Sequence, residues 1–279
     1  MTRTLYVATV HWHSEQWIEQ QLAALAQFAP GPVKVYAFLD GIGLHRDQDF
    51  HRVYRDDSLG HAEKLNLLAR EIAAEAEPED GLLFLDGDAF PIAPLEALLQ
   101  CLTDKPLAAV QRFENNGDQQ PHPCFCLTTV GFWVSISGDW RPGGYWIDAS
   151  GRRITDVGGS LLQLLNDRNI AWLPLLRSNR KELHPLWFAV YGDVAYHHGA
   201  GFRDKLCRLD AQRGMDWLSR RVIKLQASLR LQKRARWLNQ PITRWIRNYM
   251  RWRNHRRSEY VLEEIASNPR FCQALGFTE

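Results

Sequence analysis

Two aspartates separated by one glycine, Asp86 and Asp88, follow the apolar run "LLFL" at 82–85. Gly87 allows the backbone to turn tightly, so that both side chains can converge on one point. Converging carboxylates repel each other unless a cation lies between them, and a hard divalent cation that also binds a diphosphate would remove this repulsion. The spacing therefore predicts a metal site, although the same triplet also suits an ordinary solvated turn.

The elements that precede this triplet alternate between strand and helix. Apolar runs closed by polar residues predict strands, and apolar residues spaced three and four apart predict helices. We expect strands at 4–10, 33–41 and 80–88, and helices at 14–29, 61–76 and 94–102. This order indicates an α/β fold with a mostly parallel sheet and flanking helices. In such sheets, ligands bind beyond the carboxyl ends of the strands, where Asp86 and Asp88 lie.

The pattern changes after residue 105. Segments 107–113, 126–137 and 144–154 have the composition of shorter strands, which favours mixed or antiparallel sheet, and helical spacing resumes at 157–170. We expect one domain over residues 1–205 and a helical, basic extension over residues 206–279.

A strand that ends in Asp-x-Asp and follows the helix "GHAEKLNLL", with its Lys64 and Asn66, resembles the nucleotide-sugar-dependent glycosyltransferases of GT-A fold. The resemblance covers residues 4–205. It implies a Rossmann-like sheet in which the aspartates hold Mn²⁺ or Mg²⁺ against the diphosphate of a UDP- or GDP-linked sugar. It also implies that Asp40 contacts the nucleobase and that Val7 and Thr9 line the same pocket, whereas Asp40 is otherwise a turn residue.

The segment "YHHGAGFR" resembles the histidine-glycine loop that covers the diphosphate in this family. The resemblance implies a third metal ligand, for which His198 is preferred over His197 because Gly201 follows three residues later. It further implies that Arg203 and Lys205 reach phosphate oxygens. Apart from the resemblance, adjacent histidines in a loop usually face solvent.

The segment "TDVGGSLLQLL" resembles the acceptor side of inverting members of the family. This implies that Asp156 takes the proton from the attacking hydroxyl of a carbohydrate or glycolipid acceptor. A helix cap is the other interpretation of Asp156, and a retaining reaction stays open. Aromatic residues in this half predict either a wall that faces sugars or, for most of them, core packing: Trp133, Trp140, Tyr145, Trp146, Trp187 and Phe188.

Two other functions fit the same residues. In a phosphatase of the haloacid-dehalogenase type, Asp86 would be the nucleophile and Asp88 the acid/base, with Mg²⁺ as cofactor. Against this, the motif lies on the third expected strand instead of the first, and Phe90 stands where that family has a small hydroxyl residue. The second alternative is a non-catalytic module that binds a membrane or nucleic acid.

Basic residues concentrate near the C-terminus. Between Arg203 and Ser258 there are 17 Lys and Arg but only three acidic residues, while the whole chain has a net charge of +2. Tryptophans interleaved with arginines over 208–258 predict a helix that lies on an anionic membrane surface, a helix pair packed on the domain, or, as the least favoured partner, nucleic acid. The N-terminal apolar run is too short for a signal peptide, so we expect a cytoplasmic protein. The membrane alternative for the basic segment would place it peripherally on the inner face of the membrane.

Overall fold

The computed structural model describes residues 3–199, 206–207 and 236–276. The chain divides into two compact units, residues 1–201 with 270–279 and residues 202–269. The first boundary lies close to the expected one at residue 205. Residues 270–279 group with the first unit, although they fall within the extension expected over residues 206–279.

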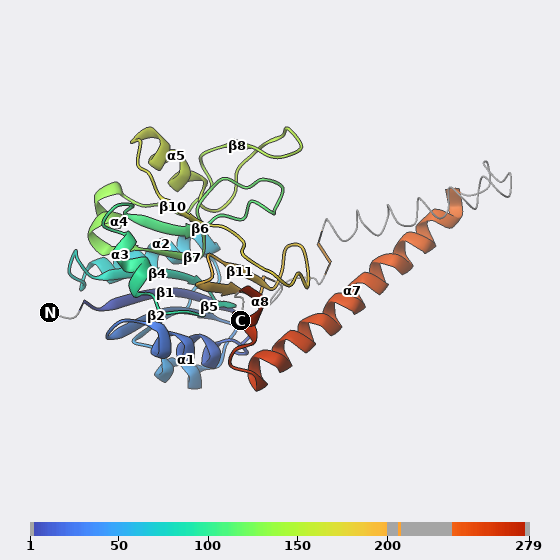
Figure 1. Cartoon of the computed structure of the whole chain (residues 1–279), viewed down its shortest axis with the longest axis horizontal. Helices are drawn as coiled ribbons and strands as arrows, with labels where there is room; N and C mark the ends of the chain where they lie inside the picture. The colour runs from blue at the N-terminus through green and yellow to red at the C-terminus, as the bar shows by residue number, and fades with distance from the viewer. Residues whose placement is uncertain (1–2, 200–205, 208–235, 277–279) are drawn as a thin grey trace. The chain divides into compact units, whose positions relative to one another are not determined.

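The first unit is built on a seven-stranded sheet with the order β10-β6-β7-β4-β1-β2-β3 (Figure 1). Its strands are β1 (Leu5–Trp12), β2 (Val33–Asp40), β3 (Arg52–Tyr54), β4 (Gly81–Asp86), β6 (Leu107–Val110), β7 (His122–Thr129) and β10 (Leu173–Leu175). All neighbours are parallel except at β7, which runs antiparallel to β4 and to β6. The prediction of an α/β fold with a mostly parallel sheet is confirmed.

Both faces of this sheet are covered, because alternate residues of each strand point to opposite sides. Along β1, Leu5 and Val7 join the core under α1 (Ile18–Phe28), whereas Tyr6, Ala8 and Val10 join the core under α2 (His61–Ala73). Further helices extend these two layers: α3 (Glu96–Cys101), α4 (Val130–Ile136) and α5 (Gly159–Asp167). The expected helices at 14–29, 61–76, 94–102 and 157–170 are therefore present in shorter form.

The expected strand at 126–137 is wrong in its second half. β7 ends at Thr129, and α4 starts immediately because the Thr129 hydroxyl accepts a hydrogen bond from the Phe132 amide at 3.2 Å. This is an N-cap, which satisfies an amide at the start of a helix. The expected strand at 144–154 is instead a hairpin of two short strands, β8 (Trp146–Ile147) and β9 (Arg153–Ile154).

A second, three-stranded sheet lies at the carboxyl edge of β4. It has the order β11-β12-β5, with β5 (Ala89–Pro91), β11 (Ala189–Tyr191) and β12 (Ala195–His197). The last helix, α8 (Phe271–Gly276), belongs to the same unit, where Gln273 Nε2 donates a hydrogen bond to the Ile92 carbonyl at 2.8 Å. This contact explains why the chain end belongs to the first unit.

In the second unit, the described residues are 206–207 and 236–269, and nearly all of the latter form one long helix, α7 (Arg236–Ser267). None of the described helices combines the length and the apolar character that crossing a lipid bilayer requires.

Candidate metal centre and its surroundings

Asp86, Asp88 and His197 form a cluster at the carboxyl end of β4. One ligand atom from each residue lies within 4.8 Å of the other two. His197 Nε2 is 3.5 Å from Asp86 Oδ2 and 3.4 Å from Asp88 Oδ1. The paired carboxylates that end the apolar strand therefore converge, as their spacing predicts.

Strand pairing brings the histidine to the aspartates. In the antiparallel pair of β5 and β12, Ala89 lies opposite His197, and the Asp88 carbonyl accepts a hydrogen bond from the His198 amide at 3.0 Å. A residue 109 positions away from Asp88 along the chain thus becomes its direct neighbour. The cluster depends on this small sheet as much as on the aspartate triplet.

The turn between the aspartates is held from two sides. The buried Gln21 side chain donates hydrogen bonds through Nε2 to the Asp86 carbonyl at 3.0 Å and to the Ala89 carbonyl at 2.7 Å. On the other side, a Cβ atom at Gly87 would lie only 2.6 Å from the Val10 carbonyl oxygen. Gly87 is therefore required because its backbone lies directly against β1.

Two further histidines surround the aspartates. His61, the first residue of α2, places Nε2 3.0 Å from Asp86 Oδ1. The His122 ring, at the start of β7, has its centre 6.2 Å from that of His197. Burial opposes ionisation of Asp86, but the His61 hydrogen bond and the charges of His61, His122 and His197 outweigh it, so the pKa of Asp86 lies well below its usual range. Burial likewise opposes ionisation of Asp88, but His197 outweighs it and lowers the pKa.

The chemistry of this donor set fits a divalent cation. Two carboxylates and one imidazole supply oxygen and nitrogen ligands, which suit Mn²⁺ and, through the oxygens, Mg²⁺. Three protein ligands would leave other coordination positions for a substrate. Both carboxylates are held in the ionised form that metal binding requires.

The residues expected to contact the donor have other partners. Asp40 and Lys64 form a buried ion pair, with side chains 1% and 8% exposed, and Asp40 Oδ1 also accepts a hydrogen bond from the Asp56 amide at 3.2 Å. Asn66 donates to Asp139 Oδ1 at 2.6 Å and accepts from the Trp140 amide at 3.0 Å. Asn66 thus ties α2 to the 139–140 loop.

Val7 and Thr9 are fully buried, because β1 continues to Trp12 and neither residue lies at its end. Val7 belongs to the hydrophobic core, and Thr9 Oγ1 lies 3.5 Å from His11 Nε2. Both side chains therefore lie in the domain interior, and their contact with a nucleobase stays a prediction. Trp12, which is paired in register with Asp40 and is 48% exposed, occupies the strand end instead.

The structure brings His197, and not the preferred His198, to the aspartates. The centre of the His198 ring lies 4.5 Å from that of the Trp17 ring and 4.8 Å from that of the Phe188 ring. Its Nδ1 lies 3.1 Å from the Tyr196 hydroxyl. β12 ends at His197, and among the described residues His197 is the histidine that groups with both aspartates. Gly201, Arg203 and Lys205 lie outside the described residues.

Asp156 is exposed and precedes α5 without capping it. The N-cap position is Gly158, and Asp156 Oδ1 accepts only a local hydrogen bond from the Val157 amide, at 2.8 Å. Asp156 therefore does not act as the side-chain cap of α5. Its carboxylate is available to solvent.

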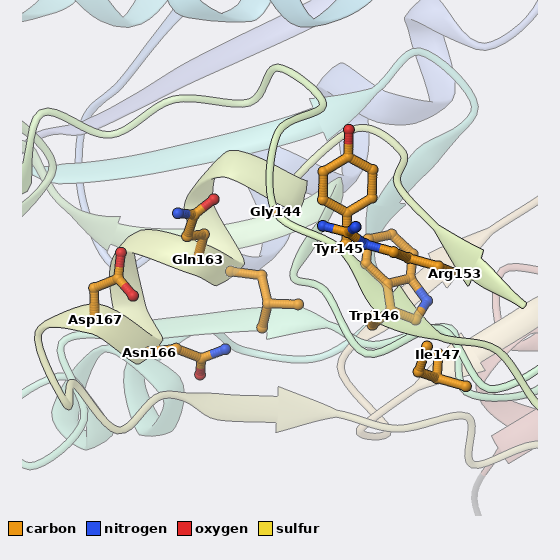
Figure 2. Close-up of a pocket in the computed structure, with 9 residues that line it drawn as sticks. Gly144, Tyr145, Trp146, Ile147, Arg153, Gln163, Asn166 and Asp167 are labelled. Atoms are coloured by element: carbon orange, nitrogen blue, oxygen red, sulfur yellow. The ribbon is translucent and has the colours of Figure 1, made fainter. Parts of the chain in front are cut away.

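A pocket of about 330 Å³ opens between the β8–β9 hairpin and α5. Figure 2 shows Tyr145 and Arg153 on the hairpin side of this pocket and Gln163, Asn166 and Asp167 on the α5 side. Tyr145 is 57% exposed, and the Arg153 guanidinium lies 4.1 Å from its ring centre. The other aromatic residues that the sequence suggested for a sugar-facing wall are buried, which agrees with the core-packing interpretation. They are Trp133, Trp140, Trp146, Trp187 and Phe188.

Three residues of the site were not identified from the sequence: Trp12, His61 and His122. His61 could have been found, because it is the first residue of a helix whose start, Gly60 with Glu63, carries a recognisable capping pattern. His122 follows a loop of Asn, Gly, Gln and Pro and carries no local signal.

No family model matches this chain, and no curated protein matches it at the significance threshold. Among solved structures, the chain is similar to S. aureus TarS 1–349, with 14% identity, 49% of each chain covered and a TM-score of 0.34. The structure of the same fragment in complex with UDP-GlcNAc gives 14% identity, 49% of this chain and 48% of that chain, and a TM-score of 0.33. The match to the glycosyltransferase GlyE of Streptococcus pneumoniae TIGR4 has 16% identity and a TM-score of 0.35, and it covers 61% of this chain and 41% of that chain. This chain therefore spans less than half of the length of each of these three chains, and similarities at this level assign no activity.

Proposed function

We propose that this protein is a metal-dependent glycosyltransferase that moves a sugar from a UDP- or GDP-linked donor to a hydroxyl of a carbohydrate or glycolipid acceptor. The observation that carries the proposal is the Asp86, Asp88 and His197 cluster at the carboxyl end of a central parallel strand. Open α/β sheets bind ligands at this edge. The DxD turn, which carries the resemblance to GT-A enzymes, lies at the same place.

In this proposal, Asp86, Asp88 and His197 hold Mn²⁺ or Mg²⁺. The ion supplies Lewis-acid stabilisation of the negative charge on the leaving nucleoside diphosphate. The chain contributes the exposed Asp156 as general base for the acceptor hydroxyl, and direct displacement would invert the anomeric carbon. The exposure of Asp156 and its place before α5 support this role.

We propose the pocket beside Tyr145 as the position of the acceptor sugar (Figure 2). An exposed aromatic ring can pack against the apolar face of a sugar, and the Gln163, Asn166 and Asp167 side chains offer hydrogen-bond donors and acceptors for its hydroxyls. Asp156 lies in the segment that joins β9 to α5, the two elements that border this pocket.

A specific observation also supports peripheral binding to anionic membranes. On α7, Trp245, Tyr249 and Trp252 are 64%, 47% and 59% exposed and follow one another at spacings of four and three, which places them on one helix face. The four buried residues Asn254, Ser258, Val261 and Ile265 lie on the opposite face. An exposed aromatic stripe with neighbouring arginines is typical of a helix that lies at a membrane surface.

The metal centre is tested by thermal unfolding with UDP, GDP and their sugar conjugates, with and without Mn²⁺. We expect a Mn²⁺-dependent rise in Tm with one nucleotide class, and loss of this rise and of sugar transfer in Asp88→Asn. Asn keeps the side-chain size but removes the charge, and the Tm of the variant without ligand checks that it is folded. Full activity of Asp88→Asn would contradict the assignment. Metal-dependent release of phosphate from a phosphomonoester, without any response to nucleotides, would instead favour the phosphatase.

The base is tested separately with Asp156→Ala. We expect sugar transfer to fall by about a hundredfold or more, which is the usual contribution of a general base. Binding of the donor, measured through the same Mn²⁺-dependent rise in Tm, should remain, because Asp156 lies outside the metal cluster. Near-normal turnover would place the base elsewhere or indicate a retaining reaction.

A further inference from the structure

Arg112 follows β6 at the same edge of the sheet as the metal cluster. β6 ends at Val110, and in the sheet it lies next to β7, which itself neighbours β4 (Figure 1). Val110 is paired with His122, the first residue of β7. Arg112 thus lies two residues beyond the end of β6, and the last residue of β6 is paired with His122.

This arginine has no partner within the described part of the chain. No hydrogen bond or ion pair involves its guanidinium there, and its Nε is enclosed without an acceptor. The two nearby carboxylates are engaged elsewhere: Glu114 Oε1 accepts from the Tyr191 hydroxyl at 2.6 Å, and Asp118 Oδ2 accepts from Asn115 Nδ2 at 2.7 Å. Burial lowers the pKa of Arg112, but the charges of neighbouring acidic groups such as Tyr191, Glu114 and Asp118 outweigh it, so the guanidinium stays charged. Its N–H groups nevertheless have no acceptor among the described residues, which leaves them for an anion.

A second unsatisfied side chain lies on the same side. Gln120 is 1% exposed, and neither its Oε1 nor its Nε2 has a hydrogen-bond partner among the described residues. A Cβ atom at Gly158, the N-cap of α5, would lie 3.3 Å from Gln120 Cγ. A second polar side chain is therefore left unsatisfied, and it lies at the start of α5.

The electrostatics connect Arg112 to the metal cluster. The pKa of His122 is lowered first by its burial and then by the charge of Arg112, while the charge of Asp86 acts in the opposite direction. His122 is thus close enough to both groups to respond to both charges. Its ring also lies 6.2 Å from that of His197, which contacts both aspartates.

We propose that Arg112 binds phosphate oxygens of the diphosphate that the Asp86, Asp88 and His197 cluster holds. The inference rests on the proposed function, because it requires a metal-bound diphosphate at that cluster. The planar guanidinium offers two parallel N–H groups that match the oxygens of a phosphate. The cation would thereby gain the acceptors that the described chain does not provide, and it would share with the metal the neutralisation of charge on the leaving group.

The test uses inorganic pyrophosphate, which needs no knowledge of the nucleotide. Isothermal titration of the full chain with pyrophosphate in the presence of Mn²⁺ should show binding. Arg112→Gln should weaken it about tenfold to a hundredfold, as expected for loss of hydrogen bonds to a charged group. Arg112→Lys keeps the charge but loses the two parallel N–H groups, so its affinity for pyrophosphate should be intermediate. It also serves as the second variant if Arg112→Gln does not fold.

Arg168→Gln is the matched control, because Arg168 is exposed and its Nη1 donates to the Ser135 carbonyl, away from the cluster. It should bind as wild type does. Unchanged binding in folded Arg112→Gln and Arg112→Lys would overturn the inference and leave the proposed function intact. Failure of the wild type to bind pyrophosphate with Mn²⁺ would overturn both.

Discussion

His11 is a buried histidine that burial keeps neutral near the metal cluster. It is 0% exposed, and burial lowers its pKa from 6.5 to about 4, although the hydrogen bond with Gln21 acts in the opposite direction. Between these two pH values the unfolded chain binds more protons at this position than the folded chain. The contribution of His11 to stability is therefore complete above pH 6.5 and falls as the pH falls towards 4.

We expect a loss of about 3 kcal/mol from this residue between pH 7 and pH 4, since each pKa unit corresponds to about 1.4 kcal/mol. Urea unfolding of the wild type and of His11→Asn at several pH values measures it. The variant should be less stable at pH 7 but should lose less stability on acidification. Parallel pH profiles for the two proteins would mean that His11 does not carry this dependence.

At the level of single residues, the sequence predicted the aspartates but not all of their partners. Asp86 and Asp88 could be identified because a glycine between two carboxylates after an apolar run is a local signal. The choice between His197 and His198 could not be made, because it depends on which face of β12 points to the cluster, and a shift of one residue reverses that face. The pairing of Ala89 with His197 decides it, and this pairing joins segments far apart in the sequence.

At the level of elements, periodicity predicted the order of strands and helices but not where they end. β1 continues to Trp12, two residues beyond the expected end, and this moves Val7 and Thr9 into the core. Similarly, "VGFWVSI" has the β-branched and aromatic composition of a strand but forms α4. The N-cap at Thr129 starts this helix, and Val130, Trp133 and Ile136 are its buried face. Such boundaries depend on caps and pairing partners, which apolar spacing does not encode.

At the level of the whole molecule, we predict that α7 binds to anionic membranes. Trp245, Tyr249 and Trp252 follow one another along the helix: the first two rings are stacked with centres 5.9 Å apart, and the Tyr249 and Trp252 rings are tilted with centres 6.0 Å apart. No acidic residue occurs between Asp216 and Glu259 in the sequence, so the charge around this stripe is positive. Aromatic side chains that insert at the interface and arginines that attract anionic headgroups would act together.

We expect the full chain to sediment with vesicles that contain phosphatidylglycerol, and to do so less as salt is raised, because salt screens the attraction to the headgroups. The double variant Trp245→Ala/Trp252→Ala should bind at least about tenfold more weakly, since each large ring contributes more than 1 kcal/mol when its apolar surface is buried. Leu44→Ala/Phe113→Ala removes two apolar side chains of the first unit that are at least as exposed, at 74% and 64%, and this variant should bind vesicles normally. An equal loss of vesicle binding in both double variants would indicate a nonspecific effect of exposed apolar surface. Absence of vesicle binding in the wild type, together with salt-sensitive binding to single-stranded nucleic acid, would assign the arginines and aromatic residues of α7 to phosphate contacts and base stacking instead.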